Sequence, residues 1–175
     1  MFQFEENEIG YTLTEYTAKD DAAVTSVKIP SVYQGEPVTC IGDCAFLYAV
    51  YLTSVIIPDS VTEIGAEAFS GCKELRSINI PSGVTEIAPE TFSACSSLER
   101  VEIPEGVTDI GEYAFNSCRL LKTVILPESI AFIGSRAFSN NPNLESINLP
   151  DKEIELEDNL FADCPKLGED IIGRK

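Results

Sequence analysis

CSSLERVEIPEGVTDIGEYAFNS, residues 95–117, is followed directly by CRLLKTVILPESIAFIGSRAFSN, residues 118–140, and the two 23-residue stretches share one pattern. Phenylalanine recurs at the same spacing through most of the chain, at Phe46, Phe69, Phe92, Phe115, Phe138 and Phe161. A fixed period of this length is typical of a solenoid, in which each repeat forms one coil and the coils stack to bury a shared core. The sequence therefore predicts a repeat solenoid.

The spacing of apolar residues changes within one repeat. The consensus reads Cys-x-x-Leu-x-x-Ile-x-Ile-Pro-x-x-Val-x-x-Ile-Gly-x-x-Ala-Phe-x-x. The Ile-x-Ile alternation predicts a strand with both side chains inward, and the proline ends that strand because it has no N–H for a sheet ladder. Val-x-x-Ile-Gly is predicted to be a second extended segment or turn on the opposite side. Ala-Phe-x-x-Cys-x-x-Leu has helix-like spacing but is long enough only for a short helical turn.

This consensus resembles that of the BspA-like leucine-rich repeat family over roughly Val24 to Leu167. The resemblance implies an α/β repeat solenoid, namely a right-handed leucine-rich-repeat superhelix with a parallel inner sheet and short helical turns or extended segments on its outer side. It also implies adhesion or protein binding, often at bacterial surfaces, and no enzymatic activity in the repeats. On this basis we expect residues 24–167 to form the solenoid, in about six repeats.

The two ends of the chain depart from the repeat. Residues 1–23 contain two alternating segments around a polar stretch, which predicts a hairpin that caps the apolar end of the first coil. Residues 168–175 are expected to form a short C-terminal tail or partial cap. A bare end there would allow self-association, or would indicate a fragment of a longer protein.

The chain carries a net charge of −17, with a pI near 4.2. Such a charge repels phosphate backbones, so we expect no nucleic-acid partner, and a protein or glycan partner that is neutral or basic. No apolar run is long enough to insert into a membrane. The N-terminus lacks the features of a secretory signal, which predicts a cytoplasmic protein if Met1 is the native start. The family resemblance instead implies a cell-surface or secreted protein.

The six cysteines fall into two groups. Four share one position of the repeat and are predicted to be buried free thiols in an inward column, with Asn141 as a substitute in one coil: Cys72, Cys95, Cys118 and Cys164. Cys40 and Cys44 occupy positions where other copies have glutamates. This pair could be a disulfide, a metal half-site or a redox element; the alternative is that the N-terminal hairpin or the loop at 33–37 covers it.

Chemistry that needs histidine is excluded, since the chain has none. This removes the usual nucleophile triads and the commonest general base. Stacked acidic residues such as Glu63, Glu86 and Asp109 could bind Ca²⁺, but no calcium-loop motif is present, and solvated acidic ridges are the simpler interpretation. We therefore expect no catalytic residues, no metal and no cofactor.

The inner sheet is the natural binding surface of a solenoid. Its outward positions, between the two inward residues of each strand, are predicted to be Lys28, Ile56, Asn79, Glu102, Ile125 and Asn148. Arg100 belongs to the preceding column, and Phe132 stands where sister copies have acidic residues. We expect these residues to meet a partner. The alternative is that the columns only solvate the sheet and that Phe132 packs under a loop.

Two hypotheses for function follow. The first is a non-catalytic protein-binding or adhesion module that uses the inner sheet. The second is a structural or self-assembling repeat element, such as part of a larger surface protein, that associates through its open C-terminal end.

Overall fold

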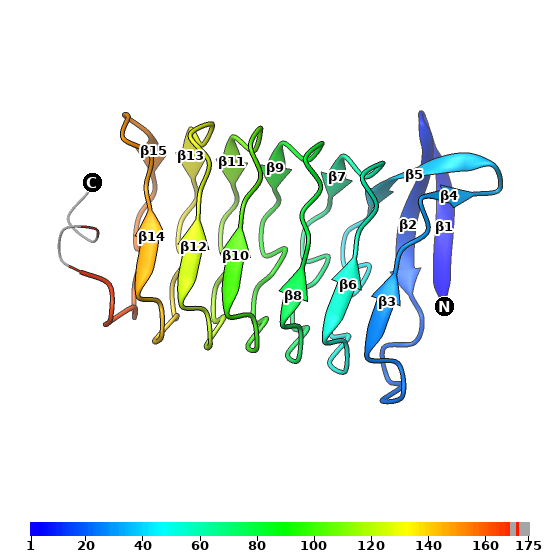
Figure 1. The fold of residues 1–175 in the computed structure, drawn as a ribbon, viewed down its shortest axis with the longest axis horizontal. Helices are drawn as coiled ribbons and strands as arrows, with labels where there is room; N and C mark the ends of the chain where they lie inside the picture. The colour runs from blue at the N-terminus through cyan, green and yellow to red at the C-terminus, as the bar shows by residue number, and fades with distance from the viewer. Residues whose placement is uncertain (169–170, 172–175) are drawn as a thin grey trace.

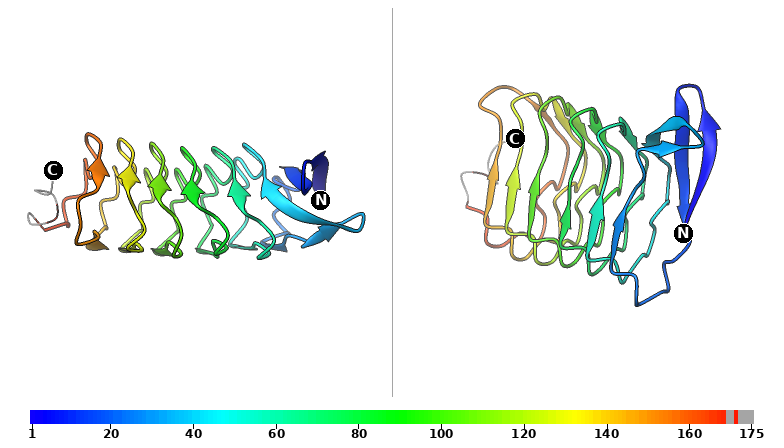
Figure 2. Two further views of the ribbon diagram at one scale, coloured as in Figure 1. Left: turned by 90° about the horizontal axis from the view of Figure 1, so that it is seen from above. Right: turned by 45° about the vertical axis from the view of Figure 1, so that its right-hand side comes forward.

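Two rows of short strands run along the sides of a stack of coils (Figure 1). The computed structural model describes residues 1–168 and 171, and the coils follow one another along an elongated body (Figure 2). Neighbouring strands pair in parallel at the repeat period, as in Arg100↔Thr123↔Ser146. The predicted repeat solenoid is confirmed.

Each coil contributes one strand to each row. The first row is made of β3 (Ser26–Lys28), β6 (Ser54–Ile56), β8 (Ser77–Ile78), β10 (Arg100–Glu102), β12 (Thr123–Ile125) and β14 (Ser146–Asn148). The second row, which the Val-x-x-Ile-Gly segments predicted, is made of β5 (Glu36–Ile41), β7 (Glu63–Ile64), β9 (Glu86–Ile87), β11 (Asp109–Ile110), β13 (Phe132–Ile133) and β15 (Glu155–Leu156). Within the described residues there is no helix with the length and apolar character needed to cross a bilayer.

The core is a stack of phenylalanine rings, one from each coil. Adjacent rings lie nearly parallel, with centroids 4.9 Å apart for Phe46 and Phe69 and 5.5 Å apart for Phe115 and Phe138. The first five rings of the stack are fully buried. Burying one such side chain stabilises the fold by about 2 kcal/mol or more, so the repeat period is fixed by the core itself.

The predicted cysteine column is confirmed as a column of buried free thiols. Each thiol donates to the carbonyl of the phenylalanine one coil earlier, as from Cys95 Sγ to Phe69 O at 3.3 Å and from Cys118 Sγ to Phe92 O at 3.2 Å. Asn141 replaces the thiol with its amide, which donates to the corresponding carbonyl of Phe115 at 2.9 Å. The column therefore adds one side-chain donor per coil to a backbone carbonyl in the core.

The N-terminal hairpin closes the first coil, as predicted. Strands β1 (Phe2–Asn7) and β2 (Gly10–Tyr16) are antiparallel, and β2 pairs with β5. The ring of Tyr16 stacks on Phe46 at 5.1 Å and so extends the aromatic stack into the cap. At the other end Ile171 packs against the core, whereas the rest of the predicted tail beyond 168 lies outside the described residues.

The short helical turns expected around each phenylalanine do not form in the solenoid. Two residues per coil, two positions before and two after the phenylalanine, have left-handed φ: Cys44, Tyr48, Glu67, Gly71, Glu90, Ala94, Tyr113, Ser117, Arg136, Asn140, Asn159 and Asp163. Such residues interrupt a helix. They direct the N–H groups of Cys44, Phe46 and Tyr48 to carbonyls of the next coil at 2.7–2.9 Å, which makes a third inter-coil ladder.

Both strand rows are interrupted once, next to the coil of residues 72–94. The first row divides between β8 and β10 and the second between β7 and β9. The bond from Ile103 N to Ile125 O, 2.9 Å, has no counterpart from Ile80 to Glu102 in the described chain. The coil is therefore tilted, so that β8 stays with β6 while β9 stays with β11.

A missing glycine explains the tilt. A Cβ atom at Gly111 would lie 2.6 Å from the backbone nitrogen of Pro89, and one at Gly134 would lie 2.7 Å from that of Glu112. These distances are shorter than real Cβ contacts, so the position allows two coils to approach closely. The tilted coil has Ala88 at this position. From the repeat register we infer that its methyl group faces the backbone of the preceding coil and holds β9 away from β7.

We expect the substitution Ala88→Gly to restore pairing between β9 and β7. The Thr85 amide should then donate to Thr62, as the Thr108 amide donates to Thr85. One added backbone hydrogen bond contributes about 1 kcal/mol, so exchange of the Thr85 amide with solvent should slow by about fivefold. Ala131→Gly, the same change at an exposed position next to β13 of this row, is the control and should leave exchange of the Thr85 amide unaffected. Unchanged exchange at Thr85 in Ala88→Gly would contradict the explanation.

Candidate binding surface

The outward side of the first strand row, here called the strand face, carries the residues predicted to bind a partner. Ile56 is the most exposed apolar side chain among them, at 51%. Lys28 is exposed beside it, whereas Ile125, two coils beyond β8, is only half-exposed. Small hydroxyl side chains fill most of the preceding column, so Ile56 stands clear of its neighbours.

Two predicted residues bind the neighbouring coil instead of facing freely outward. The Asn79 amide accepts from Ile57 N at 2.9 Å and donates to Ile57 O at 2.7 Å. Asn148 makes the same pair of bonds to Leu126, at 2.8 and 2.9 Å. Each asparagine replaces a step of the main-chain ladder, so its first role is structural.

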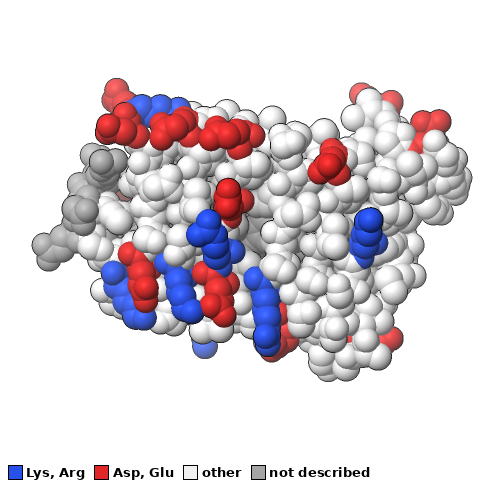
Figure 3. All heavy atoms as spheres, in the orientation of Figure 1, with Lys and Arg blue, Asp and Glu red and all other residues white. Residues whose placement is uncertain are grey.

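Charged side chains on the strand face are arranged in a ladder of alternating sign. One repeat position carries Arg76, Glu99, Lys122 and Glu145 in successive coils. Lys122 Nζ lies 2.8 Å from Glu99 Oε2, and this hydrogen bond lowers the pKa of Glu99. Figure 3 shows basic and acidic groups alternating along the lower part of this face. Although the chain is strongly acidic, this face is close to neutral.

Two hollows indent the strand face, one near its N-terminal end and one at its centre. The first lies beside strand β4 (Val32–Tyr33) and is lined by Lys28, Ile56 and Val32, whose side chain is 53% exposed. The second lies where the sheet divides, between β8 and β10. It is lined by Arg76, Ser77, Ile78, Asn79, Ile80, Arg100, Glu102 and Pro104.

The sequence did not predict the second hollow. Ile78 and Ile80 match the inward positions of the consensus, yet both are half-exposed, whereas the sister residues Val101 and Ile103 are 4% and 3% exposed. The one signal in the sequence is the replacement of glycine by Ala88 in the same coil. The predicted residues Arg100 and Glu102 line this hollow, and their side chains form an exposed ion pair of 3.4 Å.

Phe132 lies apart from the other predicted residues. It is on β13 in the second row, between Asp109 and Glu155, and is half-buried. Apart from Cys40, the residues that share its column are acidic, but no group of three or more Cys, Asp or Glu side chains in the described chain is placed to hold a metal ion.

Cys40 and Cys44 are free and half-buried. Strand β2 of the hairpin pairs Thr12 with Cys40, so the hairpin covers that position, which agrees with the simpler of the two interpretations. Burial and the neighbouring carboxylates, Glu63 for Cys40 and Glu67 for Cys44, raise the pKa of both thiols. Raised thiol pKa values disfavour the thiolate that redox chemistry requires.

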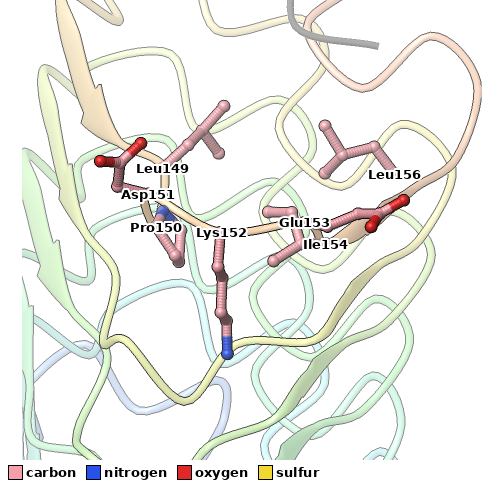
Figure 4. A pocket seen from close by; sticks show the side chains of 7 residues that line it. All are labelled: Leu149, Pro150, Asp151, Lys152, Glu153, Ile154 and Leu156. Carbon is pink, nitrogen blue, oxygen red and sulfur yellow. The ribbon is translucent and has the colours of Figure 1, made fainter.

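A further hollow lies at the C-terminal end of the solenoid. It is lined by Leu149, Ile154 and Leu156, which are half-buried, together with charged residues of the connecting loop. Figure 4 shows the Lys152 side chain extending away from these apolar groups. This end therefore presents both apolar and acidic surface.

Comparison with protein-family models matches residues 39–168 to the BspA type leucine-rich repeat region, in six copies. No curated protein matches the chain.

Several solved structures resemble the whole solenoid. A leucine-rich repeat protein of T. pallidum is 30% identical over 98% of this chain and 90% of its own, with a TM-score of 0.77. A leucine-rich cell surface protein of Faecalibacterium prausnitzii is 32% identical over 93% of this chain and 41% of its own, with a TM-score of 0.76. A leucine-rich repeat protein of Bacteroides ovatus is 32% identical, covering 95% and 50%, with a TM-score of 0.67. This chain thus spans half or less of the latter two.

Thiol reactivity should separate the two cysteine groups. Burial raises the pKa of Cys72 and Cys118 to about 12 and that of Cys95 well above its ordinary value. At pH 8 the column thiols are therefore protonated as well as buried. In native protein we expect dithionitrobenzoate to modify only Cys40 and Cys44, and slowly, whereas all six thiols should react in denaturant. Cys40→Ser and Cys44→Ser should each remove one native signal; rapid modification of a column thiol would contradict this assignment.

Proposed function

Because the chain belongs to the family of BspA-type leucine-rich repeat proteins, we propose that it is a non-catalytic binding module whose strand face meets a protein or glycan partner. The observation that carries the proposal is Ile56, an apolar side chain that is 51% exposed on the strand face, in the hollow that it shares with Lys28 and Val32. Apolar anchors of this kind, surrounded by small polar groups, are typical of binding surfaces.

The charge of the molecule favours a neutral or basic partner. A net charge of −17 repels nucleic acids and other strongly acidic molecules at long range. The near-neutral strand face adds no such repulsion at contact. The similarity to a bacterial cell surface protein supports a role at the cell surface.

Self-association is the second candidate function. It is supported by the half-buried apolar side chains Leu149, Ile154, Leu156 and Phe161 at the C-terminal end. Against it, two copies meeting at this end would bring Asp151, Glu153 and Glu155 of each chain together, and like charges oppose such a contact.

Replacing Ile56 and Ile125 by aspartate tests the strand face. We expect Ile56→Asp with Ile125→Asp to abolish binding to any partner recovered by probing arrays of purified surface proteins and glycans with the labelled chain. Leu120→Asp, the same change at a side chain that is 44% exposed outside the strand face, is the matched control and should retain binding. Exposed substitutions change the free energy of unfolding by about 0.5 kcal/mol or less, so a denaturant titration checks that the fold persists. Binding retained by the double variant would overturn the assignment.

Light scattering tests self-association. If the strand face is the functional surface, the chain should remain a monomer at concentrations up to about 100 μM, above the dissociation constants of specific dimers. A dimer that Leu156→Asp dissociates would instead establish the C-terminal end as an interface.

A further inference from the structure

The divided sheet leaves main-chain groups without partners at its centre. All other neighbouring strands of the first row are joined by backbone or asparagine hydrogen bonds. Between β8 and β10 the described chain has no hydrogen bond to the N–H of Ile80 or to the carbonyls of Arg76 and Glu102. These three groups belong to residues that line the second hollow. A donor and two acceptors along a strand edge match the main chain of an extended peptide.

Apolar side chains form one wall of the opening. Ile78 and Ile80 belong to the core by sequence, and the tilt of their coil leaves them half-exposed. Pro104 lies at the end of β10 on the other side. Covering these side chains removes apolar surface from water, which stabilises a complex.

Two arginines flank the same opening in a chain that has 29 acidic and 12 basic residues. Arg76 has no carboxylate within ion-pair distance among the described residues. Arg100 is paired only with Glu102, at 3.4 Å and with both side chains more than half exposed. An ion pair this exposed contributes little, so Arg100 can turn to a ligand at small cost. A guanidinium group is suited to bind a carboxylate, because it can form a bidentate pair of hydrogen bonds with the two carboxylate oxygens.

We propose that the opening between β8 and β10 binds an extended peptide segment that carries a carboxylate beside apolar side chains. The segment contacts Ile78 and Ile80, its carboxylate meets Arg76 and Arg100, and its main chain bonds to the free strand edges. This inference rests on the proposed function, since it makes the opening the docking point of a protein partner on the strand face. The partner as a whole is neutral or basic, and the acidic group is local to the segment.

A peptide fits the opening better than a glycan. None of the residues that line it is aromatic, so it lacks the ring faces on which sugar rings pack. Its unpaired groups instead repeat the donor and acceptor pattern of a strand.

The test uses fluorescein-labelled peptides and the full chain. The probe is an octapeptide of alternating valine and glutamate, with analogues in which glutamine or lysine replaces glutamate. Fluorescence anisotropy should show binding of the glutamate peptide, about tenfold weaker binding of the glutamine analogue and none of the lysine analogue. Amide chemical shifts of Ile78, Ile80 and Glu102 should change on binding.

Charge reversal locates the contact. Arg76→Glu and Arg100→Glu should each weaken binding of the glutamate peptide by about tenfold or more. Arg119→Glu makes the same change of net charge at an exposed residue outside the opening and should have less than about a twofold effect. Ala88→Gly, which is expected to reduce the tilt, should also weaken binding.

Three results would overturn the proposal: no peptide binding at millimolar concentration, equal affinity for the glutamate and glutamine peptides, or equal weakening by Arg119→Glu. Binding of the partner recovered from the protein and glycan arrays shows whether only the peptide-binding proposal fails or the proposed function fails too. If the Arg76→Glu, Arg100→Glu double variant keeps that partner while the Ile56, Ile125 double variant loses it, the strand face binds but the opening does not. If both keep it, the proposed function fails as well.

Discussion

Every coil of this molecule depends on hydrogen bonds made by its neighbours. A coil has no partners of its own for most of its main-chain groups, because its strands, β5 apart, are two or three residues long and its turns contain left-handed residues that exclude a helix. Three ladders, along the two strand rows and along the turns, therefore satisfy the backbone only when coils stack in register. The phenylalanine stack and the thiol column lie inside these ladders and repeat at the same period. Side-chain packing and backbone bonding thus select one spacing together.

The same dependence explains why one methyl group has a distant effect. Ala88 lies where β9 fails to pair with β7, and β8 and β10 of the same region are also unpaired, which is what a tilt of the whole coil would produce. Asn79 holds the β8 side to the preceding coil through Ile57, and the gap opens on the following side. The opening is a product of two substitutions in one coil, neither of which is unusual by itself.

Much of the fold was predictable because periodicity reports directly on burial. The 23-residue repeat predicted the coils, the two extended segments of each coil and the inward column of Cys72, Cys95, Cys118 and Cys164. It did not predict the left-handed turns, since residues as different as Glu90, Tyr113 and Arg136 adopt the same φ and glycine occurs only once among these positions, at Gly71. Outward positions were identified correctly on the strand face, but their partners were not. Asn79 and Asn148 look like free polar groups in the sequence, and only the folded structure reveals the backbone atoms that they bond.

The second hollow was missed because Ile78 and Ile80 follow the core pattern, and their exposure results from the tilt of the whole coil.

The β4–β5 hairpin shows how the chain absorbs a change of length. The first coil contains additional residues, so Ser26 pairs with Ser54 at a separation of 28 where later coils keep 23. The surplus projects outward where β4 pairs with the first two residues of β5, whereas the last two residues of β5, Cys40 and Ile41, pair with Glu63 and Ile64 in normal register. The corner of the coil between β4 and β5 therefore holds additional residues without disturbing the stacking of the coils. The later described coils keep one length, so duplication of complete 23-residue units would extend the stack in register, and this corner is the place at which we expect a grafted loop to be tolerated.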